Sequence, residues 1–270
     1  MTLHPADKAD HAAIIAFLRA HEASSIFPLA NLVGSGPSPQ QLWRVGMDRV
    51  RGVIALGSSG FLMPQWPGLD ADAVLTGLKG QRVAAAIGEA SQIEALLPHL
   101  PQPRHLSREP LCTLALDQLA MPDPQGTVLA PIRAEDAETA IRFRLAYDRE
   151  TMGLAEGPAR AKAEADVHRW IAGQSHRLLW RDGQAVAMTG LNARLPDVVQ
   201  VGGVYTPPDL RGQGLARRAV ALHLDEARAA GAQRAVLFAA TEAALRAYRA
   251  IGFGQIGWMR LALFSGAVLL

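Results

Sequence analysis

Two kinds of hydrophobic pattern alternate along the second half of the chain and predict an ordered series of elements. Short apolar or alternating runs indicate strands, whereas apolar positions three or four residues apart indicate helices. The predicted strands cover 127–132, 176–180, 184–191, 198–206, 235–239 and 258–264, and the predicted helices cover 134–152, 159–172, 215–230 and 241–253. Between the second and third strands, Asp182 and Gly183 predict a type I′ hairpin turn.

The first 120 residues repeat this order of elements. Their predicted helices cover 11–19, 22–33, 71–78 and a segment from Ser91, and their predicted strands cover 42–47, 52–56, 61–63 and 82–87. Ser91 and Glu94 have the spacing of a capping box at the start of the last helix. We therefore predict an α/β (α+β) protein with two related folds in tandem, each a mixed central sheet flanked by helices. The copies are 1–120 and 127–270, joined by 121–126, where two prolines and a glycine break the apolar pattern.

Composition narrows the class of protein. A chain of 270 residues with 49% hydrophobic content can bury the cores of two domains. The net charge is only +2 and no basic run appears, so we expect no nucleic acid partner. No apolar run approaches the ~20 residues of a membrane span, and no signal peptide is recognisable, so we expect a cytoplasmic protein without a membrane partner. The single cysteine, Cys112, excludes an intrachain disulfide and is interpreted as a strand core residue.

A glycine-rich turn between a predicted strand and helix is the strongest candidate site. Gly212 and Gly214 lack the Cβ atoms that would block close backbone approach, so the N–H groups from Gly212 to Ala216 can converge on one anion. The positive end of the helix that follows favours negative charge there. Arg211, Arg217 and Arg218 add positive charge around the turn. The segment therefore predicts a phosphate site.

This segment resembles the acyl-CoA pyrophosphate loop of the GNAT N-acetyltransferase superfamily. The signature Arg/Gln-x-x-Gly-x-Gly/Ala is met by Arg211, Gly214 and Ala216. The resemblance implies acetyl-CoA as acyl donor. It implies that acetyl-CoA contacts Val204, Tyr205, Thr206, Arg211, Gly212, Gln213, Gly214, Leu215, Ala216, Arg217 and Thr241.

A second block downstream also resembles the superfamily. Ala244 is followed four residues later by Tyr248, and then by Gly252 and Phe253. The resemblance implies that Tyr248 donates a proton to the departing thiolate, and a ring that only packs between helix and strand is the alternative. The family usually has Asn where this chain has Thr241, whose hydroxyl can still cap the helix.

The remaining chemistry is only partly defined. The resemblance to the GNAT superfamily implies that the backbone of 204–206 pairs with the pantetheine arm and that the Val204 N–H points at the acyl oxygen. In relatives that use a carboxylate on the central strand as the base, the resemblance places it near Gln200 or Gly202, and neither residue can accept a proton. The candidates left are Glu150 and a chain of water molecules, which favours a readily deprotonated acceptor such as an α-amine. The histidines show no metal-site spacing, so we expect no metal.

These observations support an acyl-CoA-dependent N-acyltransferase that acetylates the amine of a small molecule or amino acid in a ternary complex. A protein N-acetyltransferase and a non-catalytic acyl-CoA-binding or sensing module are the alternatives. Nucleotide binding by 57–60 is a distant third, because that loop lacks the dinucleotide spacing and the P-loop lysine. In the first copy, residues 64–71 lack glycine spacing and arginine, so we expect no acyl-CoA site there. The whole chain resembles bacterial predicted acetyltransferases with a tandem arrangement.

Overall fold

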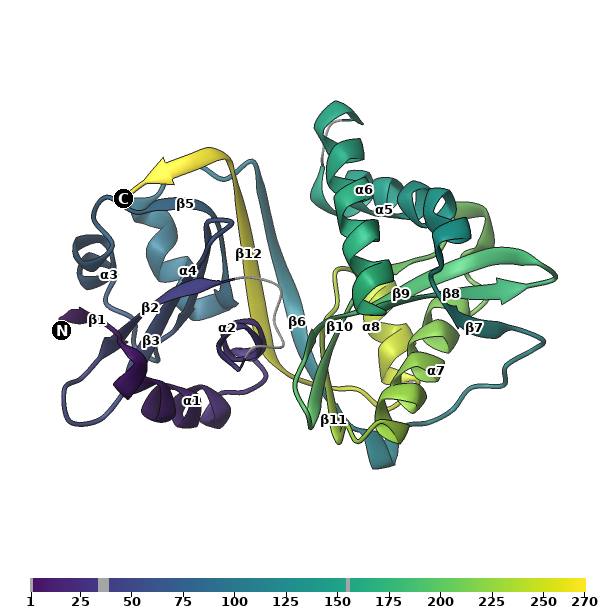
Figure 1. Cartoon of the computed structure of the whole chain (residues 1–270), viewed down its shortest axis with the longest axis horizontal. Helices are drawn as coiled ribbons and strands as arrows, with labels where there is room; N and C mark the ends of the chain where they lie inside the picture. Colours follow the sequence, from purple (N-terminus) through teal and green to yellow (C-terminus); the bar gives the residue numbers. More distant parts are fainter. Residues whose placement is uncertain (1, 34–38, 154–155) are drawn as a thin grey trace. The chain divides into compact units, whose positions relative to one another are not determined.

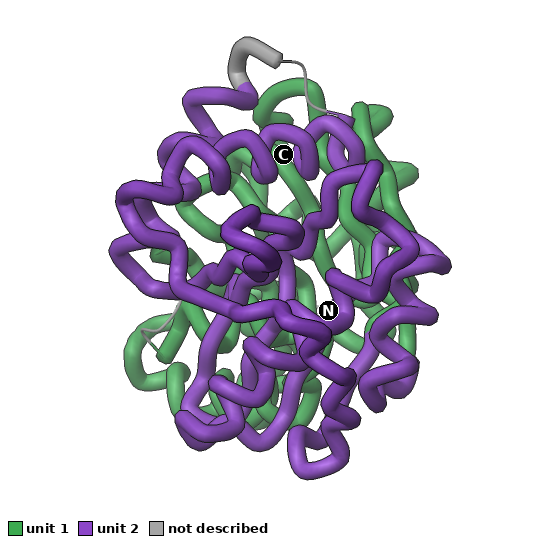
Figure 2. Tube along the Cα trace, turned by 90° about the vertical axis from the view of Figure 1, so that its right-hand side faces the viewer, with its two compact units in different colours: residues 1–111, 256–270 green, residues 112–255 purple. Residues whose placement is uncertain are grey.

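A computed structural model describes residues 2–33, 39–153 and 156–270 of the chain. The chain divides into two compact units (Figure 2). Unit 1 contains Met1–Leu111 and Ile256–Leu270, and unit 2 contains Cys112–Gln255. None of the described helices could cross a membrane.

Unit 1 is a sheet with helices on its faces (Figure 1). Its elements are β1 (Leu3–Pro5), α1 (His11–Ala20), α2 (Ile26–Leu32), β2 (Gln40–Val45), β3 (Gly52–Gly57), β4 (Phe61–Gln65), α3 (Ala71–Gly77), β5 (Arg82–Glu89), α4 (Ala90–Leu96) and most of β12 (Gly254–Leu269). The strand order is β1-β2-β3-β4-β5-β12. Neighbouring strands are antiparallel except for β4 and β5, which are parallel.

The core of unit 1 lies between the sheet and helices α3 and α4. It contains Val74 and Leu78 from α3 and its C-cap, Ile93 and Leu96 from α4, and Trp66 after β4, all at most 1% exposed. Helices α1 and α2 contact β3 and β2. Their buried side chains, Ile14, Leu18, Ile26 and Leu29, repeat at helical spacing, which explains why this stretch folds as helices.

Unit 2 repeats the element order of unit 1. Its elements are the end of β6 (His105–Ala115), β7 (Val128–Pro131), α5 (Ala137–Met152), α6 (Glu156–Gly173), β8 (His176–Arg181), β9 (Gln184–Arg194), β10 (Val198–Tyr205), α7 (Leu215–Ala229), β11 (Arg234–Phe238) and α8 (Glu242–Arg249). The strand order is β6-β11-β10-β9-β8-β7, with β10 and β11 parallel. The repeat confirms the predicted tandem arrangement.

Both faces of the unit 2 sheet are covered, as neighbouring residues of β8 show. Leu178 packs with residues of α5 and α6 such as Phe143 and Trp170. Leu179 packs on the opposite face with Leu215 of α7. Adjacent strand residues point to opposite faces, so one strand supports both helical layers. The glycine-rich turn between β10 and α7 therefore begins on a sheet that is packed on both faces.

The last strands of the two halves are exchanged between the sheets. Strand β12, the last in the sequence, pairs antiparallel with β5 of unit 1. Strand β6, which ends the first half, lies beside β11 in unit 2. The Thr113 hydroxyl donates to the Ala235 carbonyl at 3.2 Å, and the Leu116 N–H donates to the Gln233 carbonyl at 2.8 Å. Residues 121–126, predicted to join the copies, consequently lie within unit 2.

Local predictions had mixed outcomes. The type I′ turn is confirmed, because Asp182 and Gly183 have φ values of 49° and 74°. The capping box at Ser91 is wrong, since α4 already begins at Ala90 and the Ser91 hydroxyl donates to Glu89 instead. The helix predicted over 22–33 covers only Ile26–Leu32.

Candidate acyl-CoA site in unit 2

The glycine-rich turn lies where the sequence places it, between β10 and α7. Gly214 is the N-cap of α7, and the first helical hydrogen bond runs from the Arg218 N–H to the Gly214 carbonyl at 3.1 Å. The N–H groups of Leu215, Ala216 and Arg217 are therefore open at the helix start. Leu215 is 1% exposed and packs on the sheet, which fixes this end of the helix. The arrangement suits an anion held by backbone N–H groups.

Both glycines of the turn adopt left-handed conformations. Gly212 has φ +79° and Gly214 has φ +72°, where a side chain is strained. A Cβ on Gly212 would meet no atom within 4 Å, so that residue faces open space. A Cβ on Gly214 would lie 3.0 Å from Arg217 Nε. Both positions thus need glycine because of their positive φ. At Gly214 the absent side chain also leaves room for Arg217.

Strand β10 leaves its parallel neighbour just before this turn. It is paired with β11 from Val198 to Val201, and that register ends at the Val201–Leu237 pair. On the other side, its pairing with β9 shifts between Gly202 and Tyr205. In the described registers Val204 has no partner in either strand, and its side chain packs on the core beside α7 and α8. Diverging strands of this kind leave backbone free to pair with a ligand.

Glu150 meets the end of β10 and the turn. Its carboxylate accepts hydrogen bonds from the Tyr205 hydroxyl at 3.3 Å and from Arg211 Nη2 at 2.5 Å. Arg211 Nε also donates to the Thr206 carbonyl at 3.0 Å. Burial, and then the charge of Glu150, raise the pKa of Tyr205. Arg211 therefore ties the last turn of α5 to the segment after β10, and Glu150 is paired.

The other arginines near the turn have different partners. Arg218 is 2% exposed and donates to the Asp123 carbonyl and to Gln125 Oε1, both at 2.7 Å. It holds the 121–126 segment, and burial lowers its pKa. Arg181, at the end of β8, donates to Gln213 Oε1 at 2.9 Å. The contact of Arg181 could not be predicted from the sequence, because 32 residues separate it from Gln213 and strand pairing brings the two together.

Tyr248 and Thr241 lie in and before α8. Thr241 is the N-cap, and its hydroxyl oxygen accepts from the Ala244 N–H at 3.1 Å, so the predicted cap is confirmed. Tyr248 is 6% exposed and belongs to the core between the sheet, α7 and α8. Its ring meets Phe253 edge to face with centroids 6.1 Å apart. Cys112 lies in the same core, where burial raises the pKa of its thiol.

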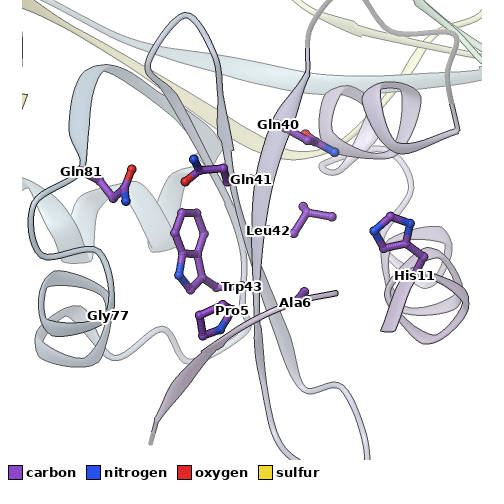
Figure 3. Close-up of a pocket in the computed structure, with 9 residues that line it drawn as sticks. All are labelled: Pro5, Ala6, His11, Gln40, Gln41, Leu42, Trp43, Gly77 and Gln81. Carbon is purple, nitrogen blue, oxygen red and sulfur yellow. The ribbon is translucent and has the colours of Figure 1, made fainter. Parts of the chain in front are cut away.

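Two hollows belong to unit 1 instead. One of about 460 Å³ is lined by the first four residues of β2, with Gln41 and Trp43 on one side of the strand and Leu42 on the other (Figure 3). The second shares Gln40, Gln41 and Gln81 with it. None of the lining residues belongs to the predicted acyl-CoA site. Within 2–33, 39–153 and 156–270, no three His, Cys, Asp or Glu side chains are grouped to hold a metal ion.

Comparison with known proteins identifies the class. Residues 142–253 match the model of the acetyltransferase (GNAT) family. This segment runs from α5 to the end of the α8 block, so the second half of the chain carries a domain of the GNAT superfamily of N-acetyltransferases.

Solved structures share the fold over nearly the whole chain. A GNAT acetyltransferase from Colwellia psychrerythraea is 15% identical with a TM-score of 0.55, and the match covers 98% of this chain and 100% of that one. A GCN5-related N-acetyltransferase from Kribbella flavida is 20% identical with a TM-score of 0.58, covering 94% and 96%. A tandem GNAT protein from the clavulanic acid biosynthesis pathway is 14% identical with a TM-score of 0.57, covering 97% and 98%. No curated protein matches the sequence.

Proposed function

We propose that unit 2 is an acyl-CoA-dependent N-acyltransferase that transfers acetyl from acetyl-CoA to the amine of a small molecule or amino acid. The observation that carries the proposal is the set of open N–H groups at the start of α7, placed directly after a strand that leaves its neighbour. A pyrophosphate suits the open N–H groups, and a pantetheine amide suits the unpaired end of β10. Gly212, facing open space, lets the ligand approach the backbone.

The reaction needs a polarised carbonyl, a neutral amine and a proton for the thiolate. The amine nitrogen attacks the thioester carbon, a C–N bond forms, the C–S bond breaks and CoA leaves as a thiol. We assign the Val204 N–H to the acyl oxygen and the Tyr248 hydroxyl to protonation of the sulfur. A tyrosine of pKa ~10 is a weak acid for this step, so its position must compensate.

Glu150 is paired with Arg211, and this pairing limits its possible role in the reaction. Its carboxylate already accepts hydrogen bonds from an arginine and a tyrosine, so fewer of its lone pairs are free to accept the proton of an amine. We assign it to positioning the turn and to contact with the acceptor, and assign removal of the amine proton to water. Its role as a base stays a prediction.

A non-catalytic acyl-CoA-binding module is the second candidate. It is favoured by the use of Glu150 in an ion pair and of the Thr241 hydroxyl as a helix cap. Both observations leave the proposed site poor in free acid and base groups.

One experiment separates the candidates. The protein is titrated with acetyl-CoA by calorimetry and is then incubated with acetyl-CoA and amines, with free thiol as the readout. The panel contains amino acids, glucosamine, spermidine and a lysine peptide. Thiol release with a small amine supports the acyltransferase, whereas release with the peptide alone supports a protein acetyltransferase. Binding without release from any amine supports the binding module, and absence of binding contradicts both.

A further inference from the structure

Strand β9 carries a bulge at Asn192. Ala193 lies opposite Gln200 of β10, and Leu191 lies opposite Val201, so Asn192 has no counterpart in the register. An extra residue in one strand of an antiparallel pair bends that strand and redirects a side chain. Bulges are frequent beside active sites, and this one lies next to the end of β10 that the proposed function uses.

The bulge lays the Asn192 side chain directly on Gly202. A Cβ on Gly202 would lie 1.8 Å from Asn192 Nδ2 and 2.8 Å from its Cγ. Gly202 pairs with Gly190 across the strands, and a Cβ on Gly190 would in turn lie 2.1 Å from His176 Nε2. Two facing glycines are thus covered by two polar side chains on the face that carries α5 and α6.

The two polar side chains differ in access. His176 is 1% exposed and stacks on Trp170 of α6, with ring centroids 3.7 Å apart and planes at 11°. It therefore packs inside the unit. Asn192 is exposed, and its carboxamide makes no hydrogen bond with the described residues. An oxygen and two N–H donors are free to meet a ligand.

The position of Asn192 relates it to the acyl group. Gly202 precedes Val204 by two residues, so their Cα atoms lie at most ~7 Å apart. The three atoms that a Cβ on Gly202 would meet first all belong to the Asn192 carboxamide, so the absent side chain leaves room for that group over the backbone. The glycine and the bulge together place an amide beside the end of β10 that the proposed function uses.

We propose that Asn192 binds the acceptor amine, with its Oδ1 accepting an N–H of the amine while the lone pair faces the acyl carbon. The assignment rests on the proposed function. A carboxamide neither takes up a proton nor stabilises an ammonium ion as a carboxylate does. It therefore suits an amine that loses its proton readily, such as an α-amino group of pKa ~8, better than a lysine side chain of pKa ~10.4.

The first test compares Asn192→Ala with Asn192→Asp in thiol-release kinetics on the same amine panel. The alanine variant should raise the acceptor KM by about tenfold, because one hydrogen bond is lost, while the acetyl-CoA KM stays within about twofold. The aspartate variant should recover the acceptor KM, since its carboxylate oxygen accepts the same N–H. Arg194→Ala, two residues away and bonded to the Gly173 carbonyl, is the matched control and should leave the acceptor KM unchanged.

A second variant displaces the Asn192 carboxamide without changing Asn192 itself. Gly202→Ala adds the Cβ that overlaps the amide and should displace the flexible Asn192 side chain, so its acceptor KM should match that of Asn192→Ala. Gly202 does not have a positive φ, so the backbone accepts alanine. The double variant should show no further loss, because the displaced group is already absent.

The outcomes separate the two proposals. An active wild-type enzyme with an unchanged acceptor KM in Asn192→Ala would overturn the role of Asn192 alone. A lysine peptide as the best acceptor would overturn the substrate class. If acetyl-CoA binds but no amine releases thiol in the wild type, the proposed function fails and the assignment of Asn192 fails with it.

Discussion

The turn after β10 and the turn after β4 hold the same place in the two units, yet their backbone N–H groups have different partners. In unit 2 the N–H groups at the start of α7 are open. In unit 1 the Ala73 N–H donates to the Asp70 side chain at 3.1 Å, and the Trp66 N–H donates to the buried Gln92 side chain at 2.7 Å. In unit 1 these N–H groups therefore already have side-chain acceptors, the anionic Asp70 in the turn and Gln92 of α4.

The difference shows that topology alone does not make the site. Strands β4 and β5 are parallel and share only the Phe61–Ala85 and Leu62–Ala86 pairs, so the parallel pairing is short in unit 1 as well. Helix α3 has 7 residues, whereas α7 has 15. A longer helix with unfilled N–H groups presents a stronger positive end to a phosphate. In the proposed function, the side chains of the turn therefore decide that only unit 2 binds acetyl-CoA.

Gly214→Val should have the largest effect among the substitutions that separate the two turns. The wild type should bind one acetyl-CoA per chain in calorimetry, and the variant should bind at least about 100-fold more weakly, because a branched side chain at φ +72° strains the turn and displaces Arg217. Gly231→Val is the matched control, since Gly231 also has a positive φ, at +105°, with nothing within 4 Å, and lies beyond the other end of α7. Unchanged affinity in the Gly214 variant, or two acetyl-CoA molecules per wild-type chain, would contradict the comparison.

Local chemistry explains how much of this could be predicted from the sequence. The glycine-rich turn could be predicted because Gly212 and Gly214 determine the conformation of their own backbone. The hairpin at Asp182 and Gly183 could be predicted for the same reason. The exchange of β6 and β12 could not be predicted, because an apolar strand pattern shows which face of a strand is buried and does not show which strand lies beside it. The pairing of Glu150 with Arg211, 61 residues apart, and the bulge at Asn192 depend on register, which no short motif encodes.

A second substitution tests the chemical step in unit 2. Tyr248→Phe should lower kcat by about 10- to 100-fold, because only the proton donor is removed, and should leave acetyl-CoA affinity unchanged. The phenylalanine ring keeps the contact with Phe253, so the thermal midpoint should change little. Tyr248→Leu also removes the ring and should lower stability. Equal turnover in Tyr248→Phe and the wild type would mean that the ring only packs.

Acid sensitivity should also differ between the units. Among the described histidines, only His176 and His223 of unit 2 are buried. Burial, with Arg177 and Arg194 nearby, lowers the pKa of His223 to about 3, and burial holds the pKa of His176 well below 6.5. The unfolded chain therefore binds more protons than the folded chain between these pKa values and about 6.5. Above about pH 6.5 these histidines do not lower the free energy of unfolding. As the pH decreases below that value, each lowers it by up to about 1.4 kcal/mol per pH unit.

The measurement is urea unfolding of the wild type and His223→Gln at pH 7.5 and pH 5.0, with hydrogen exchange to assign the loss to a unit. Glutamine does not titrate, so the variant should lose about 2 kcal/mol less than the wild type over this interval, and the remaining loss should fall mainly in unit 2. The same pH dependence in both proteins would show that His223 does not contribute.

The smallest expected effect concerns Glu150 and Arg211, the pair that joins α5 to the turn in unit 2. Their side chains are 40% and 48% exposed, so the ion pair is screened by water, and Glu150→Gln should lower kcat/KM by no more than about fivefold. Arg211→Gln also loses the hydrogen bond to the Thr206 carbonyl, and the double variant should lose little more than Arg211→Gln, because that variant already lacks the ion pair. A general base would behave differently. If Glu150 took the amine proton, Glu150→Gln alone would lower kcat by about 100-fold or more and would remove a limb of the pH–rate profile, whereas Arg211→Gln would leave that limb in place. The pH–rate profiles of the three variants therefore decide whether Glu150 holds the turn or carries the proton.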